Sequence, residues 1–349
     1  MIEVQKALDQ VASQNATKSR DGLIHLLQAI QRQDLESEDL LAAPERVVSS
    51  MDMHLTDTAV QRWGAEALDV LFRRFAIQGP ANERAICALI GGAKSNCKGA
   101  EVQRWCFGAL TSSLALATSD RLAILILEQD VMGVVANAMQ SHPESPALLE
   151  SAAGLICLLV SEAGEAAADQ AYDTGCLRLL QGILQSSEDT CLKASCLRAL
   201  WAVSESNGEL GATELAADSG LESAITILMQ EPELHRWAAS LVHSMLAKGG
   251  RLVAESALAL NAAEALVNSM AVQRDDVSTV VRCTAALATL AKHGPDFAVS
   301  ILEAGGLGCV EEMAALHGLE GELGHWFHAL QEAIDHCTDT DDDLSPASH

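Results

Sequence analysis

A recurrent Arg-Trp pair is the feature of this sequence best suited to contact another molecule. Trp and Arg side chains combine a large contact area with directional polar contacts, and they are the residue types most often found as binding hot spots. We therefore interpret this row, together with Glu66 one turn after the first Trp, as a candidate partner-binding surface. Its members are Arg62, Trp63, Glu66, Arg104, Trp105, Arg236, Trp237, Arg282 and Trp326.

Sequence patterns of catalytic and cofactor sites are missing from the chain. It has no Gly-rich phosphate loop followed by Lys-Ser/Thr, no GxSxG and no HExxH. His325, His328 and the His336-Cys337 pair form the most metal-like group, but their spacing fits no zinc pattern. We expect a protein that is not an enzyme and that carries no metal or cofactor.

Charge narrows the class of partner. The chain has 48 acidic and 22 basic residues, a net charge of −26, which opposes binding to nucleic acid and to anionic membranes. One explanation of the acidic excess is the solubility of an apolar repeat protein. The other is steering of a basic protein or peptide toward an acidic patch in the stretch 122–177, which lacks Lys and Arg. The patch residues are Glu144, Glu150, Glu162 and Glu165.

Seven stretches with one apolar pattern supply the framework for these side chains. Taking Trp63 as the anchor, the equivalent residues follow at steps of 42, 46, 44, 42, 46 and 43. This is the period of two- and three-helix units that stack into solenoids, because one such unit cannot bury its apolar face alone. The anchors are Trp63, Trp105, Ser151, Ser195, Trp237, Cys283 and Trp326.

Each repeat divides into helices by its apolar spacing. In the last helix of the first clear unit, Val60, Gly64, Ala67, Leu68 and Leu71 share one face. The anchor lies at the edge of that face, so we expect each Trp ring to remain partly exposed. Corresponding last helices are predicted at 148–159, 192–203, 234–245, 280–290 and 323–334. Helices before them are predicted at 46–53, 83–90, 131–139, 176–184, 221–229, 263–270 and 307–313, and shorter first helices at 122–128, 165–171, 211–217, 253–260 and 297–303.

A short helix, a glycine turn and two longer helices resemble the armadillo repeat. The residues that carry the resemblance are the turn Glu303-Ala304-Gly305-Gly306-Leu307 and the Val-Gln pairs at Val60-Gln61 and Val102-Gln103. Met139 with His142-Pro143, like Met51 with His54, is similar to divergent units of protist armadillo proteins and of the N-terminal regions of leucine-rich-repeat kinases. The resemblance implies an all-α, right-handed solenoid of about seven armadillo/HEAT-like repeats that binds protein or peptide partners in the groove lined by the third helices.

One departure from the family pattern bears on function. Importin-α-type members carry a Trp, and four residues later an Asn, in the third helix; aligning the Val-Gln pairs puts Glu66 and Val70, then Gly108 and Ser112, at those places. We therefore favour a non-catalytic protein-binding scaffold. The alternatives are a regulatory or targeting module of a larger assembly such as a repeat-containing kinase, and a nuclear-transport adaptor.

The expected organisation is one solenoid with two flanking segments. Residues 1–39 should form capping helices at 6–13 and 22–31, residues 40–336 the repeats, and residues 337–349 an acidic disordered tail. The N-terminus does not resemble a signal peptide, and no apolar run approaches the 18 residues of a membrane span. We expect a cytoplasmic protein, with a nuclear location open, and no membrane insertion.

Overall fold

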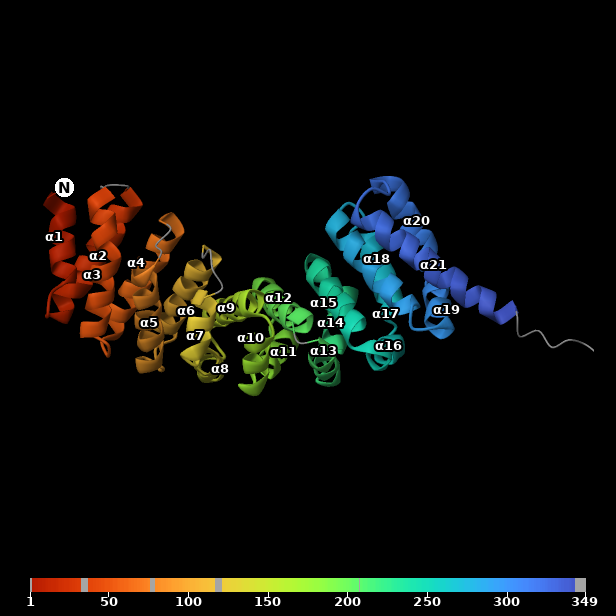
Figure 1. Cartoon of the computed structure of the whole chain (residues 1–349), viewed down its shortest axis with the longest axis horizontal. Coiled ribbons are helices and arrows are strands. Elements are labelled where there is room, and N and C mark those ends of the chain that lie inside the picture. The colour runs from red at the N-terminus through yellow and green to blue at the C-terminus, as the bar shows by residue number, and fades with distance from the viewer. Residues whose placement is uncertain (1, 33–36, 76–78, 117–120, 207, 343–349) are drawn as a thin grey trace, which may run out of the picture. The chain divides into compact units, whose positions relative to one another are not determined.

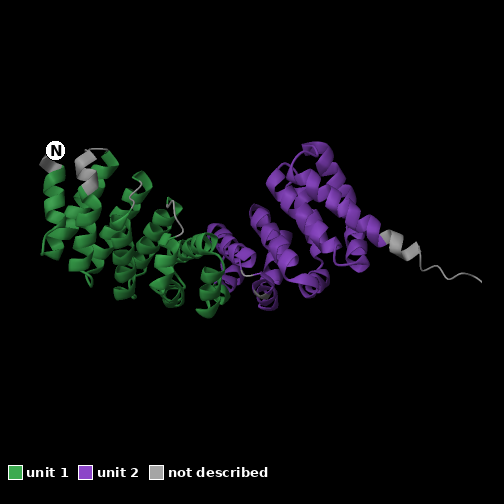
Figure 2. Ribbon diagram, viewed as in Figure 1, with its two compact units in different colours: residues 1–179 green, residues 180–349 purple. Residues whose placement is uncertain are grey.

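The protein is all-helical in the residues that the structure describes. The computed structural model describes residues 2–32, 37–75, 79–116, 121–206 and 208–342, and in these ranges it contains twenty-one α-helices, one 3-10 helix and no strand. The chain divides into two compact units, Met1–Leu179 and Leu180–His349 (Figure 2).

Antiparallel helices follow one another in the first unit (Figure 1). They are α1 (Ile2–Val11), α2 (Ala16–Arg32), α3 (Ser37–Met53), α4 (Thr58–Arg74), α5 (Pro80–Ser95), α6 (Ala100–Ala115), α7 (Arg121–Glu128), α8 (Val131–Ser141), α9 (Pro146–Ala163) and α10 (Glu165–Asp173). Helix α11 (Cys176–Ser186) contains the boundary between the units.

The second unit continues with three helices in each repeat. Its helices are α12 (Thr190–Ser206), α13 (Gly208–Ala217), α14 (Gly220–Gln230), the 3-10 helix η1 (Pro232–Leu234), α15 (His235–Lys248), α16 (Gly250–Ala259), α17 (Ala262–Val272), α18 (Val277–Ala291), α19 (Pro295–Glu303), α20 (Gly306–His317) and α21 (Glu322–Asp342).

Every helix predicted from apolar spacing is present. The third helices of the seven repeats are α4, α6, α9, α12, α15, α18 and α21, and the second helices are α3, α5, α8, α11, α14, α17 and α20. Two predicted boundaries differ from the structure. The boundary at residue 40 falls inside α3, and the predicted tail begins inside α21, which continues to Asp342. Residues 343–349 lie outside the described residues.

The third helices pack on one another and form one layer in each unit. Helix α4 packs between α2 and α6, and α6 packs on α9. In the second unit α15 packs between α12 and α18, and α18 packs on α21. The second helices form a neighbouring layer, in which α3 contacts α5, and α17 lies between α14 and α20. The layers are held by small apolar side chains, because the core is rich in Ala, Leu and Val.

Helix α9 corrects one expectation from the sequence. Its 18 residues, Pro146–Ala163, are long and apolar enough to cross a membrane by length and composition. A bent pair, α7 with α8, passes the same test. In the structure the buried residues of α9, among them Leu148, Ile156 and Val160, belong to the core, and the helix packs on α6 and α8. Inter-helix packing therefore accounts for the apolar character of α9.

The turn between first and second helices requires a left-handed backbone. Residues with positive φ recur there in successive repeats, and two of them are glycine: Gly175 (φ 78°) and Gly305 (φ 74°). In the Asp218-Ser219-Gly220 turn the left-handed residue is Ser219 (φ 69°), not the glycine. Gly220 serves a different purpose, because a Cβ on it would lie 2.6 Å from the Leu215 carbonyl oxygen.

Polar side chains at the ends of five second helices, α3, α5, α8, α17 and α20, connect the repeat to the one before it. Their spacing along the chain equals about one repeat, so the same turn is joined to its equivalent in the neighbouring unit. Each donates to a main-chain carbonyl: His54 to Ser13, Asn96 to Leu55, His142 to Cys97, Gln273 to Pro232 and His317 to Arg274, at 2.6–3.0 Å.

The glutamines of the two Val-Gln pairs are buried next to these connections. Gln61 Nε2 donates to the carbonyls of Met51 at 2.6 Å and His54 at 3.1 Å, at the end of α3. Gln103 Nε2 donates to the carbonyl of Ala93 at 3.5 Å, near the end of α5. The carbonyls in the last turn of a helix lack partners within that helix. The Val-Gln start of a third helix therefore completes the end of the second helix.

We expect Gln61→Ala to lower the free energy of unfolding by about 1–3 kcal/mol, because it leaves the buried Met51 carbonyl without its side-chain donor. Thermal unfolding followed by circular dichroism measures the loss. Gln31→Ala, on the exposed side of α2, is the matched control and should change the melting temperature much less. Equal, small shifts for the two variants would show that the Gln61 hydrogen bonds do not stabilise the repeat.

Candidate functional site

All five tryptophans of the chain lie on third helices. Trp63, Trp105, Trp237 and Trp326 occupy the anchor positions of α4, α6, α15 and α21, and each is partly exposed, as predicted. Trp201 on α12 is also partly exposed but was missed, because it lies six residues after the anchor of its helix. The side chains that the sequence singles out therefore lie on one type of helix in both units.

In the first unit an arginine covers each tryptophan. The Arg62 guanidinium carbon lies 4.0 Å from the centre of the Trp63 ring, and that of Arg104 lies 4.7 Å from the Trp105 ring. Such cation–π contacts fix both side chains and contribute about 0.5–1 kcal/mol at exposed sites. Both arginines also pair with acids: Arg62 with Glu66 at 3.5 Å and Arg104 with Glu101 at 3.1 Å. The positive charges of this group are thus largely matched within the protein.

Trp105 Nε1 of α6, a donor, is shielded from solvent and has no hydrogen-bond partner among the described residues. Glu66 Oε2 of α4, an acceptor, is shielded as well and has only its ion pair with Arg62 at 3.5 Å, without a hydrogen bond. Burial raises the pKa of the Glu66 carboxyl, and the guanidinium groups of Arg62 and Arg104 oppose that rise. Burying a polar atom without a partner is costly. Trp105 Nε1 therefore carries the larger cost, because Glu66 keeps its ion pair with Arg62.

A buried carboxylate that accepts two hydrogen bonds lies further along α4. Asp69 is buried on α4 and accepts hydrogen bonds from Ser112 Oγ at 2.6 Å and Arg73 Nε at 3.1 Å. Because Ser112 belongs to α6, this bond joins the two third helices. Asp69 was not identified from the sequence, where it reads as an outward-facing acid. The hydrogen bond from Ser112 therefore joins α4 to α6 about two turns after Trp63 and Trp105.

Two arginines from adjacent helices flank Trp237 in the second unit. The guanidinium of Arg236 lies 4.9 Å from the ring centre and that of Arg198, on α12, lies 5.3 Å from it. The ring of Trp201 is 6.2 Å away at an angle of 44°. Helices α12 and α15 therefore present an aromatic and cationic cluster in which only Arg236 and Trp237 were predicted.

Trp326 on α21 has different neighbours. His243 of α15 meets the ring edge-on at 5.2 Å, His325 lies at 5.0 Å, and the Lys292 ammonium is 5.7 Å from the ring centre. Burial lowers the pKa of His243; Arg282 and Lys292 act in the same direction and Glu205 against it. The imidazole is therefore neutral at pH 7.

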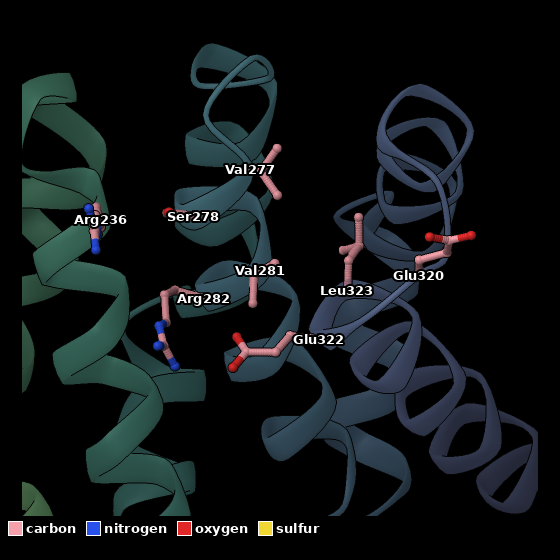
Figure 3. A pocket seen from close by; sticks show the side chains of 8 residues that line it. All are labelled: Arg236, Val277, Ser278, Val281, Arg282, Glu320, Glu322 and Leu323. Atoms are coloured by element: carbon pink, nitrogen blue, oxygen red, sulfur yellow. The ribbon is translucent and has the colours of Figure 1, made fainter.

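Arg282 of α18 has Cys283, not Trp, beside it and lines a pocket with Arg236. The pocket, of about 260 Å³, lies between the first turns of α15, α18 and α21 (Figure 3). Its apolar part consists of the exposed Val277 and the buried Val281 and Leu323. The remaining lining residues are Ser278, Glu320 and Glu322.

The predicted row of Arg and Trp residues therefore exists as two groups, one in each compact unit. The first contains Arg62, Trp63, Glu66, Arg104 and Trp105 on the adjacent helices α4 and α6. The second contains Arg236, Trp237, Arg282 and Trp326 on α15, α18 and α21. Helices α9 and α12 carry Ser151 and Ser195 at the anchor position, so the Trp row is interrupted there.

The four glutamates of the predicted acidic patch are exposed but do not form one patch. Glu144 precedes α9, Glu150 lies in its second turn, and Glu162 and Glu165 lie at its end and at the start of α10. With a rise of about 1.5 Å per residue, Glu150 and Glu162 are about 18 Å apart along the helix. This exceeds the Debye length of about 8 Å at physiological salt, so the two ends act separately.

No protein-family model matches the chain, and no curated protein matches it. Solved structures do. An engineered protein aligns with a TM-score of 0.69 at 18% identity, covering 95% of this chain and 88% of that one. A designed armadillo repeat protein in complex with the peptide (KR)4 aligns with a TM-score of 0.60 at 16% identity, covering 70% of this chain and 98% of its own. A computationally designed armadillo repeat protein for modular peptide recognition aligns with 0.61 at 14% identity over the same shares. The chain has an armadillo-like repeat fold.

Proposed function

We propose that this protein is a non-catalytic scaffold that binds a segment of a partner protein along its third helices. The observation that carries the proposal is that all five tryptophans lie on third helices and remain partly exposed. Each of them is contacted by a neighbouring cation or aromatic ring that restricts the indole. Rigid, partly exposed Trp and Arg side chains are the residues that most often supply binding energy.

Two polar atoms at α4 and α6 suggest how a segment would be held. A peptide group presents one acceptor and one donor. The carbonyl of an extended segment that crosses α4 and α6 would accept from Trp105 Nε1, and its N–H would join Arg62 at Glu66 Oε2, after a side-chain movement that exposes both atoms. The designed neighbours, one made for modular peptide recognition and one bound to (KR)4, support a segment as the occupant.

The competing explanation is that each tryptophan seals the junction between two repeats. A ring with that role should be buried, because its contribution comes from contacts with both neighbours. The rings of Trp63 and Trp105 are instead partly exposed, and an arginine of the same helix, rather than a side chain of the next repeat, lies over each ring. This arrangement favours binding over sealing.

Peptides that bind the full chain can be selected from a displayed library of random sequences. We expect the double change Trp63→Ala and Trp105→Ala to weaken the binding of these peptides. The loss should be about 2 kcal/mol or more, roughly thirtyfold in Kd, as for hot-spot residues. Fluorescence anisotropy measures the affinity, and circular dichroism measures the melting temperature of the same variant.

Two controls make this measurement decisive. Tyr172→Ala removes an exposed aromatic side chain from α10 and should leave the affinity unchanged. Phe72→Ala removes a buried ring from α4 and should destabilise by about 3–5 kcal/mol. If the tryptophan variant loses as much stability as Phe72→Ala while its affinity is unchanged, the rings seal junctions and the proposal is wrong.

We also propose that the acidic residues around α9 steer a basic segment toward the first unit. Replacing Glu144, Glu150, Glu162 and Glu165 with Gln should slow association and weaken its salt dependence, with little change in dissociation. Stopped-flow association at low and moderate salt measures the effect. The matched control makes the same charge change on exposed acids of the second unit: Glu255, Glu264, Glu303 and Glu311 to Gln. Equal effects of the two sets would leave net charge as the only role of the four glutamates.

A further inference from the structure

Charge is separated between helix types in the second unit. Three of its third helices, α12, α15 and α18, carry five basic residues and one acidic residue. Its first and second helices, α13, α14, α16, α17, α19 and α20, carry nine acidic residues and one basic residue. A chain with a net charge of −26 thus gathers positive charge on the helices that carry Trp201 and Trp237. The last third helix, α21, is acidic and begins at the pocket with Glu322.

Two cations of this surface, Arg236 and Arg282, differ from other cations of the unit in their partners. Lys193 of α12 pairs with Glu231 at 2.6 Å. Away from the pocket, Arg251 pairs with Glu255 at 2.9 Å, and Arg274 pairs with Glu312 at 3.8 Å. Arg236 and Arg282 have no carboxylate within 4.0 Å in the part of the chain that the structure describes. Their guanidinium groups therefore keep their capacity for charge-assisted hydrogen bonds.

Packing keeps one of these cations in place beside an apolar surface. The Arg236 guanidinium lies over the Trp237 ring, which restricts its side chain before any partner binds. On the α18–α21 side of Arg282 the pocket is lined by Val277, Val281 and Leu323 (Figure 3). Such a pocket suits an apolar side chain with acidic neighbours on the side of the two arginines.

We propose that the third-helix surface of the second unit binds an acidic segment of a partner protein. An apolar side chain of the segment enters the pocket between α15, α18 and α21, and flanking carboxylates bond to Arg236 and Arg282. This inference rests on the proposed function, since it names the chemistry of a segment bound along third helices. It separates the second unit from the acidic surroundings of α9, for which a basic segment is proposed.

The net charge of the protein distinguishes specific binding of an acidic segment from non-specific electrostatic attraction. A chain with a charge of −26 attracts basic peptides over most of its surface and repels acidic ones. At about 0.15 M salt the screening length is about 8 Å, so contacts at the pocket dominate over distant charges. Preference for an acidic peptide under these conditions requires local recognition.

The test uses the full chain and three peptides of equal length, (DL)4, (NL)4 and (KL)4, with Kd measured by fluorescence anisotropy at about 0.15 M salt. We expect (DL)4 to bind about tenfold or more tightly than (NL)4, the factor that corresponds to about 1.4 kcal/mol of charge-assisted bonding. The variant R236Q/R282Q should abolish this advantage. The control R251Q/R274Q, with the same charge change in the same unit, should retain it.

A second variant reverses the sign of the effect. The rim carboxylates of Glu320 and Glu322 repel an acidic segment, so E320Q/E322Q should bind (DL)4 more tightly than the unchanged chain. These positions and both arginines are at least partly exposed, and circular dichroism checks that each variant keeps its helical content.

Three outcomes overturn the inference: equal affinity for (DL)4 and (NL)4, tighter binding of (KL)4, or an advantage of (DL)4 that survives R236Q/R282Q. The library-selected peptides distinguish this failure from failure of the proposed function. If their binding still depends on Trp63 and Trp105, the scaffold function stands and only the acidic specificity is wrong. If no peptide binds in a tryptophan-dependent way, both the scaffold function and the acidic specificity are wrong.

Discussion

Stacking of each repeat on the one before it is the constraint on which this structure depends. One armadillo-like unit cannot bury its apolar face alone, so its neighbours complete its core. Apolar packing between Ala- and Leu-rich helices tolerates sliding, whereas hydrogen bonds between fixed positions do not. Asn96, His142 and His317 each reach a carbonyl in the preceding repeat. These bonds set the register that places equivalent residues of the third helices side by side.

The fixed register between repeats places equivalent side chains of successive third helices next to one another, so that they form a surface. Gln61 and Gln103 fix the start of each third helix against the end of the second helix of the same repeat, and α4 and α6, which carry Trp63 and Trp105, pack directly on each other. The two units share one type of repeat, but the arginines on their third helices have different partners. Acids of the same helix pair with the stacked arginines of α4 and α6, whereas Arg236 has no carboxylate close by among the described residues.

The sequence predicted the helices and the exposed tryptophans, because both follow from apolar periodicity within one helix. It did not predict features that arise between helices. Asp69 reads as solvent-facing, and its burial depends on Ser112 from the next repeat. Trp201 lies off the anchor position, and its contact with Trp237 depends on how α12 and α15 pack. The left-handed residue at Ser219 was hidden by the adjacent glycine.

Acrylamide quenching of intrinsic fluorescence tests most directly whether a segment binds along the third helices, because every tryptophan lies on a third helix and the quencher is uncharged. With a selected peptide at saturation, we expect a lower quenching constant than for the free chain, since a segment bound along third helices covers indole rings. An unchanged quenching constant at full occupancy would place the binding surface elsewhere and contradict binding along the third helices.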